Sequence, residues 1–311
     1  MNNLVNIRPT LDLNVCKDFS DAHLKVLFDY FADQVDERIQ RLLISELMVR
    51  YTELSKQLDE KNKILKHYND NLEALVQKKV KEISSSQVAT IHALVKASEA
   101  RDDDTGAHIE RTSAYCRLTA ERLLAQGIYA DLMDKDFADN IGMASPLHDI
   151  GKIGIPDAIL LKPGKLTPDE FEIMKTHVSI GYETLASVVK LYPENGFIRI
   201  GSEIARYHHE KWDGSGYMQG LAGENIPLSA RIMALADVYD ALRSRRVYKE
   251  PFTHEHTMSI IVQGRGSHFD PQIVDVFVKH NLEYCEIFDR LSAEQEADNP
   301  IVKISNVEKY R

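Results

Sequence analysis

One long segment of the chain lacks the two residues that most often end a helix. Residues 36–105 contain neither glycine nor proline. Within this segment, positions spaced alternately by three and four residues form a seam in which nine of eleven side chains are apolar or aromatic: Ile44, Leu47, Tyr51, Leu54, Leu58, Lys61, Leu65, Tyr68, Leu72, Leu75 and Lys79. A repeat of about 3.5 residues is typical of a left-handed coiled coil, in which a polar seam residue such as Lys61 fixes register at some cost in stability. The pattern predicts a long helix, and it favours an intermolecular coiled coil over a helix packed on its own domain.

The remainder of the chain is expected to be helical too. No segment shows a convincing alternation of apolar and polar residues, which a half-buried strand would require. Glycine and proline cluster in residues 151–164, 214–227 and 264–271, which marks these segments as loops. A mild break is expected at Ser84–Ser86, followed by a further helical stretch from Val88. We therefore predict an all-α fold with a helical and coiled-coil region over 1–85, a compact domain over 88–291 and a polar tail over 292–311.

Composition limits the partners that the chain can have. Its net charge of −10 gives no general attraction for a nucleic acid duplex. No apolar run approaches the length of a membrane span, and Met1–Thr10 lacks the apolar core of a signal peptide. Cys16, Cys116 and Cys285 are odd in number and far apart, which argues against a disulfide framework and fits a reducing cytoplasm.

Seven side chains of the kind that bind metal ions are spread over about 130 residues. They are His108, His148, Asp149, His177, His208, His209 and Asp237. No simple amphipathic pattern explains the five histidines. Imidazole and carboxylate together suit Fe, Mn, Zn or Ni, and a shared carboxylate can bridge two ions. A fold that brings the seven together would hold two metal ions, which is enough to activate water against a phosphate ester.

Three of these segments have an ordinary structural explanation when each is taken alone. The acids and Thr-Gly that precede His108 are typical of a helix start. The pair His148-Asp149 is equally consistent with a buried histidine and its paired acid. A lone histidine such as His177 near a helix end is usually structural. Lys152 follows Asp149 by three residues, on the same side of a helix, where it could meet a substrate phosphate.

Two other segments are harder to explain without a ligand. Adjacent histidines that lead into a glycine-rich loop, as His208 and His209 do, are much rarer by chance. Asp237 lies in a largely apolar helical stretch, where an unpaired buried carboxylate is costly and a metal ion would offset the cost. A basic cluster follows it, with Arg246 and Lys249 among its members, although a solvated surface explains that cluster equally well.

In their order along the chain, these motifs resemble a known family. The pattern H…HD…D formed by His108, His148-Asp149 and Asp237 resembles the HD phosphohydrolase superfamily, which has an all-helical fold. His177, the His208-His209 pair and the Gly214-x-Gly216-Tyr217 loop resemble the HD-GYP subfamily, over residues 88–291. The resemblance implies a bacterial signalling enzyme that hydrolyses cyclic di-GMP, or the related cyclic GMP-AMP, to linear pGpG and further to GMP.

The resemblance also implies a role for each matching residue. His108, His148, Asp149 and Asp237 would hold one metal ion, and Asp149 would bridge to a second ion held by His177, His208 and His209. Asp104 is the candidate ligand of a third ion, and iron or manganese is favoured. Asp149 and Lys152 would be catalytic, with Lys152, Arg246 and Lys249 contacting the substrate.

The sequence departs from the family signature at one position. The triplet Gly-Tyr-Pro is Gly216-Tyr217-Met218 here. Methionine lacks proline's fixed φ and has an N–H group, so a looser loop is expected. The resemblance makes this loop a contact for a diguanylate cyclase-type partner.

The N-terminal coiled coil predicts a homodimeric input element that passes a rotation or register change to the catalytic helices. Two other functions stay open. One is a cyclic dinucleotide receptor without turnover, and the other is an HD hydrolase of mononucleotides. The additional histidines and the Arg246/Lys249 pair favour cyclic dinucleotide hydrolysis.

Overall fold

The computed structural model describes residues 37–99, 107–134, 136–245 and 250–298. Every regular element in these ranges is a helix, and the single β-type contact is an isolated bridge between Arg265 and Phe269. The prediction of an all-α fold is confirmed. The chain divides into two compact units, residues 1–83 and residues 84–311. None of the helices in the described ranges combines the length and the apolar character that crossing a bilayer requires.

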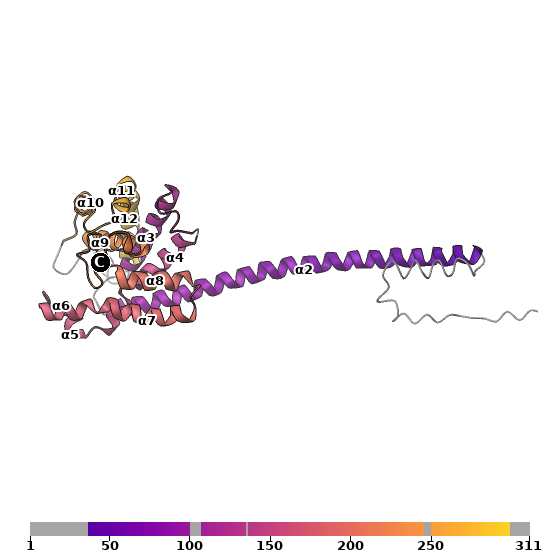
Figure 1. Cartoon of the computed structure of the whole chain (residues 1–311), viewed down its shortest axis with the longest axis horizontal. Coiled ribbons are helices and arrows are strands. Elements are labelled where there is room, and N and C mark those ends of the chain that lie inside the picture. The colour runs from indigo at the N-terminus through magenta and orange to yellow at the C-terminus, as the bar shows by residue number, and fades with distance from the viewer. Residues whose placement is uncertain (1–36, 100–106, 135, 246–249, 299–311) are drawn as a thin grey trace, which may run out of the picture. The chain divides into compact units, whose positions relative to one another are not determined.

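Helix α2 runs without interruption from Glu37 to Glu99 (Figure 1). The break expected at Ser84–Ser86 is absent, because serine lowers helix stability only modestly and keeps the backbone N–H that proline lacks. Along residues 44–75 the apolar seam side chains are 37–71% exposed. Beyond Leu75 the exposed apolar row moves to Val76, Val80 and Ile83. Within the N-terminal unit, no described residue covers this row.

The second unit is a bundle of short helices. In order these are α3 (Ala107–Ala125), α4 (Phe137–Ala144), η2 (Ser145–Gly154), α5 (Asp157–Leu160), α6 (Pro168–Lys175), α7 (His177–Leu191), α8 (Gly196–Tyr207), η3 (Gly223–Asn225), α9 (Leu228–Arg243), α10 (His254–Gln263), α11 (Pro271–Lys279) and α12 (Asn281–Asp298). At the start of several of these helices, a side chain accepts a hydrogen bond from a backbone N–H group. Asn195 does so at α8 and Asp270 at α11. Helix α12 continues beyond residue 291, where the predicted polar tail would begin.

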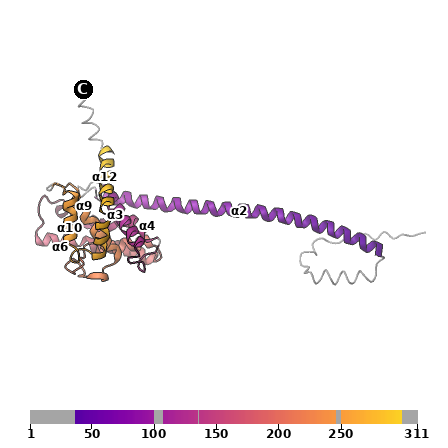
Figure 2. The same ribbon diagram turned by 90° about the horizontal axis from the view of Figure 1, so that it is seen from above.

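Helix α3 lies at the centre of the bundle, where it contacts α4, α9, α11, α12 and η2. Figure 2 shows α3, α4, α9 and α12 from above, with α10 beside α9. Helices α7 and α8 lie side by side and both pack on η2 (Figure 1). The fully buried tyrosines Tyr115, Tyr239 and Tyr284 join α3, α9 and α12 through ring contacts. This packing brings η2 close to the start of α7, to the end of α8 and to the middle of α9.

Candidate metal centre

The seven residues singled out from the sequence lie on four helices and in the turn that follows a fifth. His108 is in the first turn of α3, His148 and Asp149 are in η2, and His177 is the first residue of α7. His208 and His209 directly follow α8, and Asp237 is in α9. The structure brings all seven together in two groups, each with its ligand atoms within 4.8 Å of one another: His108, His148 and Asp237 in one, and Asp149, His177, His208 and His209 in the other.

The carboxylate of Asp149 lies between the two groups. Its Oδ2 atom is 3.2 Å from Nε2 of His148, which belongs to the first group. Its Oδ1 atom is 3.3 Å from Nε2 of His177 and 3.7 Å from Nε2 of His208, in the second group. The two oxygens therefore face different groups, as the oxygens of a bridging carboxylate do.

Four of the histidines are held in one orientation by an acceptor at Nδ1. The Nδ1 atoms of His148, His177 and His208 lie 2.7–2.9 Å from backbone carbonyl oxygens. Nδ1 of His108 lies 2.8 Å from Oδ2 of Asp240. Because these oxygens only accept, each Nδ1 must donate, and a neutral ring then presents the lone pair of Nε2 to the centre. Such outer partners are typical of metal-binding histidines.

The centre contains buried polar atoms without a hydrogen-bond partner. Nε2 of His148, of His177 and of His208 are all buried and unpaired. In the neutral rings these lone pairs face the oxygens of Asp149 at the distances given above, which is repulsive unless a cation lies between them. A divalent metal ion fits this donor set of imidazoles and carboxylates.

The charge states favour metal binding as well. Burial lowers the pKa of His209 to about 4, and burial together with the neighbouring His209 holds the pKa of His208 well below its usual value. Burial raises the pKa of Asp149, but the charge of Lys152 and the proton that His148 can take up outweigh burial and hold that pKa well below the usual range. Burial lowers the pKa of His148, but the charge of Asp149 raises it by more, so a metal ion bound at Nε2 of His148 would take the place of a proton. Neutral imidazoles beside an ionised carboxylate are the forms that bind metal.

Sequence reasoning missed the partner of His108. Asp240 lies three residues after Asp237 on α9 and is buried. It accepts hydrogen bonds from Nε and Nη2 of Arg111 at 2.6 and 2.8 Å, besides its contact with His108. Burial raises the pKa of Asp240, and the hydrogen bonds from Arg111 and His108 lower it by more, so the group stays ionised. The sequence feature that could have indicated this partner is a second acid one helical turn after Asp237.

A close backbone contact sets the distance between η2 and α7. A Cβ atom added at Gly151 would lie 1.9 Å from the carbonyl oxygen of His177 and 2.6 Å from the amide nitrogen of Gly181. Only glycine therefore permits this approach. The contact places Asp149 against His177, so a residue that binds nothing itself determines the geometry of the second group.

The predicted substrate contacts are only partly described. Nζ of Lys152 lies 3.0 Å from Oδ2 of Asp149, on the side that the spacing predicted. Because η2 is a 3₁₀ helix, residues three apart lie directly above one another. Asp104, Arg246 and Lys249 lie outside the described residues.

The signature loop is beside the second group. The ring of Tyr217 stacks on that of His209 at 4.6 Å and meets Phe171 edge-on at 6.0 Å. Nζ of Lys175 lies 5.7 Å from the centre of the Tyr217 ring. Gly214 has a φ of +80°, which permits the turn that leads into the loop.

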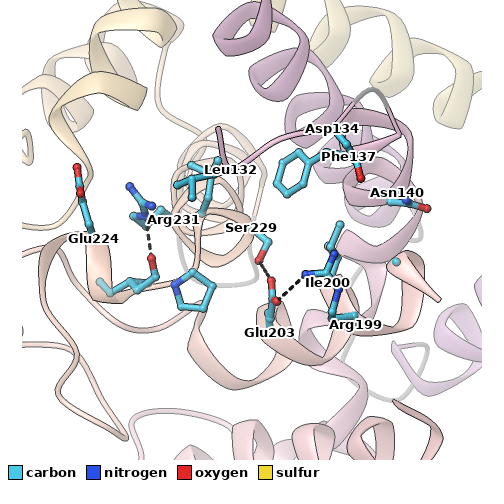
Figure 3. Close-up of a pocket in the computed structure, with 14 residues that line it drawn as sticks. Leu132, Asp134, Phe137, Asn140, Arg199, Ile200, Glu203, Glu224, Ser229 and Arg231 are labelled. Carbon is cyan, nitrogen blue, oxygen red and sulfur yellow. Dashed lines mark hydrogen bonds and ion pairs between the residues drawn. The ribbon is translucent and has the colours of Figure 1, made fainter. Parts of the chain in front are cut away.

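A separate cavity of about 260 Å³ lies between α4, α8 and the start of α9 (Figure 3). Two of its polar side chains are paired within the lining: Oγ of Ser229 donates to Glu203 at 2.7 Å, and Nε of Arg231 donates to the carbonyl oxygen of Ile226 at 2.9 Å. None of the described residues that line it has a buried side-chain nitrogen or oxygen without a partner. Buried imidazole nitrogens without a hydrogen-bond partner are found at the histidine centre instead, and this centre is therefore the candidate site.

Comparisons with known proteins show which family this part of the chain resembles. A family model described as an HD domain matches residues 103–273. A probable cyclic di-GMP phosphodiesterase of Vibrio cholerae serotype O1 is 49% identical over 239 residues, which cover 76% of this chain and 54% of that protein. The cyclic di-GMP phosphodiesterase response regulator RpfG of Xanthomonas campestris is 40% identical over 261 residues, which cover 84% of this chain and 65% of that protein.

A 3'3'-cGAMP-specific phosphodiesterase 2 of Vibrio cholerae is 36% identical over 285 residues, which cover 90% of this chain and 49% of that protein. The chain thus spans about half to two thirds of the length of these relatives. A crystal structure of a cyclic GMP-AMP-specific phosphodiesterase of Vibrio cholerae aligns with a TM-score of 0.45 and 17% identity, over 64% of this chain and 50% of that one.

Proposed function

The chain belongs to the HD domain family and, within it, to the HD-GYP branch, and from this premise we propose that it is a metal-dependent phosphodiesterase of cyclic dinucleotides. The relatives named above act on cyclic di-GMP or on 3'3'-cGAMP, and we propose cyclic di-GMP as the substrate, with cyclic GMP-AMP as the related alternative. The observation that carries this proposal is the carboxylate of Asp149 between two groups of inward-facing ligand atoms.

The donor set supports two divalent ions, for which we propose iron or manganese. His108, His148 and Asp237 would hold one ion, and His177, His208 and His209 the other, with Asp149 shared. Asp104 is the proposed ligand of a third ion. Bound there, the ions would supply Lewis acidity, lowering the pKa of water and offsetting charge on a phosphate. Metal analysis of protein purified without chelators should find two or three ions per chain, and a chain with one ion would contradict the shared centre.

The chain's own residues then have distinct tasks in the reaction. Carbonyl and carboxylate acceptors at Nδ1 keep the ligand rings fixed, so the site needs little reorganisation during the reaction. Lys152, now 3.0 Å from Asp149, is placed to meet a phosphoryl oxygen of the substrate. Arg246 and Lys249 are proposed to grip the dinucleotide. Water attacks phosphorus, the bond to the ribose 3′-oxygen breaks, and the proton lost from water is balanced by one taken up by that oxygen, which leaves as a 3′-hydroxyl. The product is linear pGpG, which a second cleavage would convert to GMP.

One assay separates this function from its alternatives. Metal-loaded protein is incubated with cyclic di-GMP, cyclic GMP-AMP and mononucleotides, and the products are resolved by chromatography. We expect linear dinucleotide from a cyclic substrate and no turnover by Asp149→Ala. The matched control Asp139→Ala removes an exposed acid paired with Arg117 and should retain activity. Binding without cleavage would instead support a receptor, and cleavage of mononucleotides alone would support another HD hydrolase.

We further propose that α2 pairs with the α2 helix of a second chain as a parallel coiled coil. The exposed apolar seam over residues 44–75 supports this, because such a row is costly to leave in water. The cysteine pattern supports a cytoplasmic location. A monomer at micromolar concentration in light scattering would contradict the dimer.

Following the family, we propose the loop at Gly216 and Tyr217 as the contact for a diguanylate cyclase-type partner. If Tyr217→Ala captured such a partner in a pull-down as well as the wild-type protein does, this proposal would be contradicted.

A further inference from the structure

A buried carboxylate that is not among the candidate ligands lies directly after the histidine pair. Glu210 is 2% exposed. Its Oε1 atom accepts hydrogen bonds from the backbone N–H groups of Met218 at 3.1 Å and Gln219 at 2.6 Å. Its Oε2 atom is buried without a partner. A carboxylate is rarely fully buried unless it is paired, and both donors to Glu210 are backbone N–H groups of the signature loop.

The loop folds back onto the segment that carries Glu210. A Cβ atom added at Gly216 would lie 2.5 Å from the amide nitrogen of Lys211 and 2.6 Å from the carbonyl oxygen of His209. The N–H of Tyr217 points to the same carbonyl oxygen at 3.4 Å. Residues 209–211 and 216–219 are therefore in close backbone contact, and the stacking of Tyr217 on His209 depends on this contact.

Met218 supplies one of the two N–H groups that donate to the carboxylate of Glu210. A proline at this position would fix φ near −65° and would have no N–H to satisfy. Methionine has the freer backbone and a donor that water or a protein acceptor must satisfy. In this chain the donor is satisfied by Glu210, so the looser loop expected from the sequence has a specific restraint.

We propose that Glu210 is a positioning residue that binds the Met218 and Gln219 amides and thereby holds Tyr217 against His209. The effect on loop order is independent of any reaction. The effect on turnover rests on the proposed function. It predicts that Glu210 matters more in this chain than in a variant with proline at 218.

Hydrogen exchange measured by mass spectrometry on metal-free protein tests the loop directly. A hydrogen bond to a charged group contributes about 1.5–3 kcal/mol, and 1.4 kcal/mol corresponds to tenfold. We therefore expect Glu210→Ala to accelerate exchange over residues 216–219 by at least about tenfold. The matched control is Glu224→Ala, which removes an exposed acid a few residues further on and should leave that exchange unchanged.

A double variant distinguishes this restraint from general damage. With proline at 218 only the Gln219 amide still donates to Glu210, so Glu210→Ala should accelerate exchange less when it is added to Met218→Pro than when it is made alone. Should Glu210→Ala fail to fold, Glu210→Met with and without Met218→Pro decides the same question, since methionine fills similar space without an oxygen acceptor. Unchanged exchange in the Glu210 variants, or the same acceleration with and without proline at 218, would overturn the proposal.

Turnover gives a second readout. With two ions still bound, Glu210→Ala should lower kcat/KM for cyclic di-GMP by about tenfold, and by less when it is added to Met218→Pro. If the wild-type protein hydrolyses no cyclic dinucleotide, the proposed function fails while the exchange measurement still decides the role of Glu210. Wild-type kcat/KM in the Glu210→Ala variant, with its exchange accelerated, would show that the loop restraint does not serve the reaction and would overturn that part.

Discussion

Replacing Asp240 by asparagine tests whether the candidate metal centre depends on residues that bind no metal. The Asp240 carboxylate is buried and accepts two hydrogen bonds from Arg111 and one from His108. Asparagine keeps the shape and one acceptor oxygen but places an NH₂ group towards one of the donors. Removing one partner of a buried ion pair costs about 3–5 kcal/mol, and the retained oxygen should reduce this to about 3 kcal/mol.

The same change should weaken metal binding. Without a carboxylate at Nδ1, the ring of His108 loses the partner that fixes its orientation towards Asp237, and outer-partner changes typically cost 10–100-fold in metal affinity. Denaturant unfolding of chelator-treated protein measures the first effect. Calorimetric titration with Mn²⁺ measures the second, and the loss should appear in one of two binding steps.

A second buried ion pair provides the control. Asp270 is 2% exposed, lies 2.6 Å from Nη1 of Arg231 and accepts a hydrogen bond from Tyr129 at 2.8 Å. Asp270→Asn should lower the free energy of unfolding by a similar amount and leave Mn²⁺ affinity at the wild-type value. Equal Mn²⁺ affinities for the two variants would refute the reasoning, because stability and metal orientation would then be unrelated at Asp240.

Three further substitutions test other features of the structure. Gly151→Ala should separate η2 from α7, lower the free energy of unfolding by about 1–3 kcal/mol and reduce the bound ions below two in metal analysis. Gly142→Ala is its control, since the new Cβ would mainly meet the flexible Arg117 side chain. Lys152→Met should leave the ion count unchanged and raise KM for cyclic di-GMP about tenfold in steady-state kinetics, so an unchanged KM would exclude a phosphate contact. Lys61→Leu should make the α2 seam continuous and tighten the dimer in sedimentation equilibrium.

The helical fold could be predicted from the sequence because the features that indicate a helix are properties of residues close together in the chain. The absence of glycine and proline over residues 36–105 was sufficient to predict most of α2. The predicted break at Ser84–Ser86 was wrong, because a weak local preference does not interrupt a helix whose other residues favour it. The acid-rich stretch that marked a helix start lies outside the described residues, and α3 occupies the described residues that follow it from Ala107.

The ligand types could be selected from the sequence, but the features that orient them could not. Three of the four Nδ1 acceptors are backbone carbonyls of Ser145, Met174 and Ile204, and a carbonyl group is present at every residue. The fourth, Asp240, is a visible acid, but its role depends on an arginine 129 residues away in sequence. Long-range contacts of this kind follow from helix packing, which no local pattern specifies.

The geometry of η2 explains how two adjacent residues can serve two groups of ligands. Successive side chains of a helix with about three residues per turn point about 120° apart, so His148 faces the first group while Asp149 faces the second. The short carboxylate then reaches back to His148 with Oδ2 and forward to His177 with Oδ1. The separation of the two groups is therefore set by one side chain and by the backbone contact at Gly151. A shift of η2 relative to α7 would therefore move Asp149 against His177 within the second group, while the ring of His177 stays held by the carbonyl oxygen of Met174 on α6.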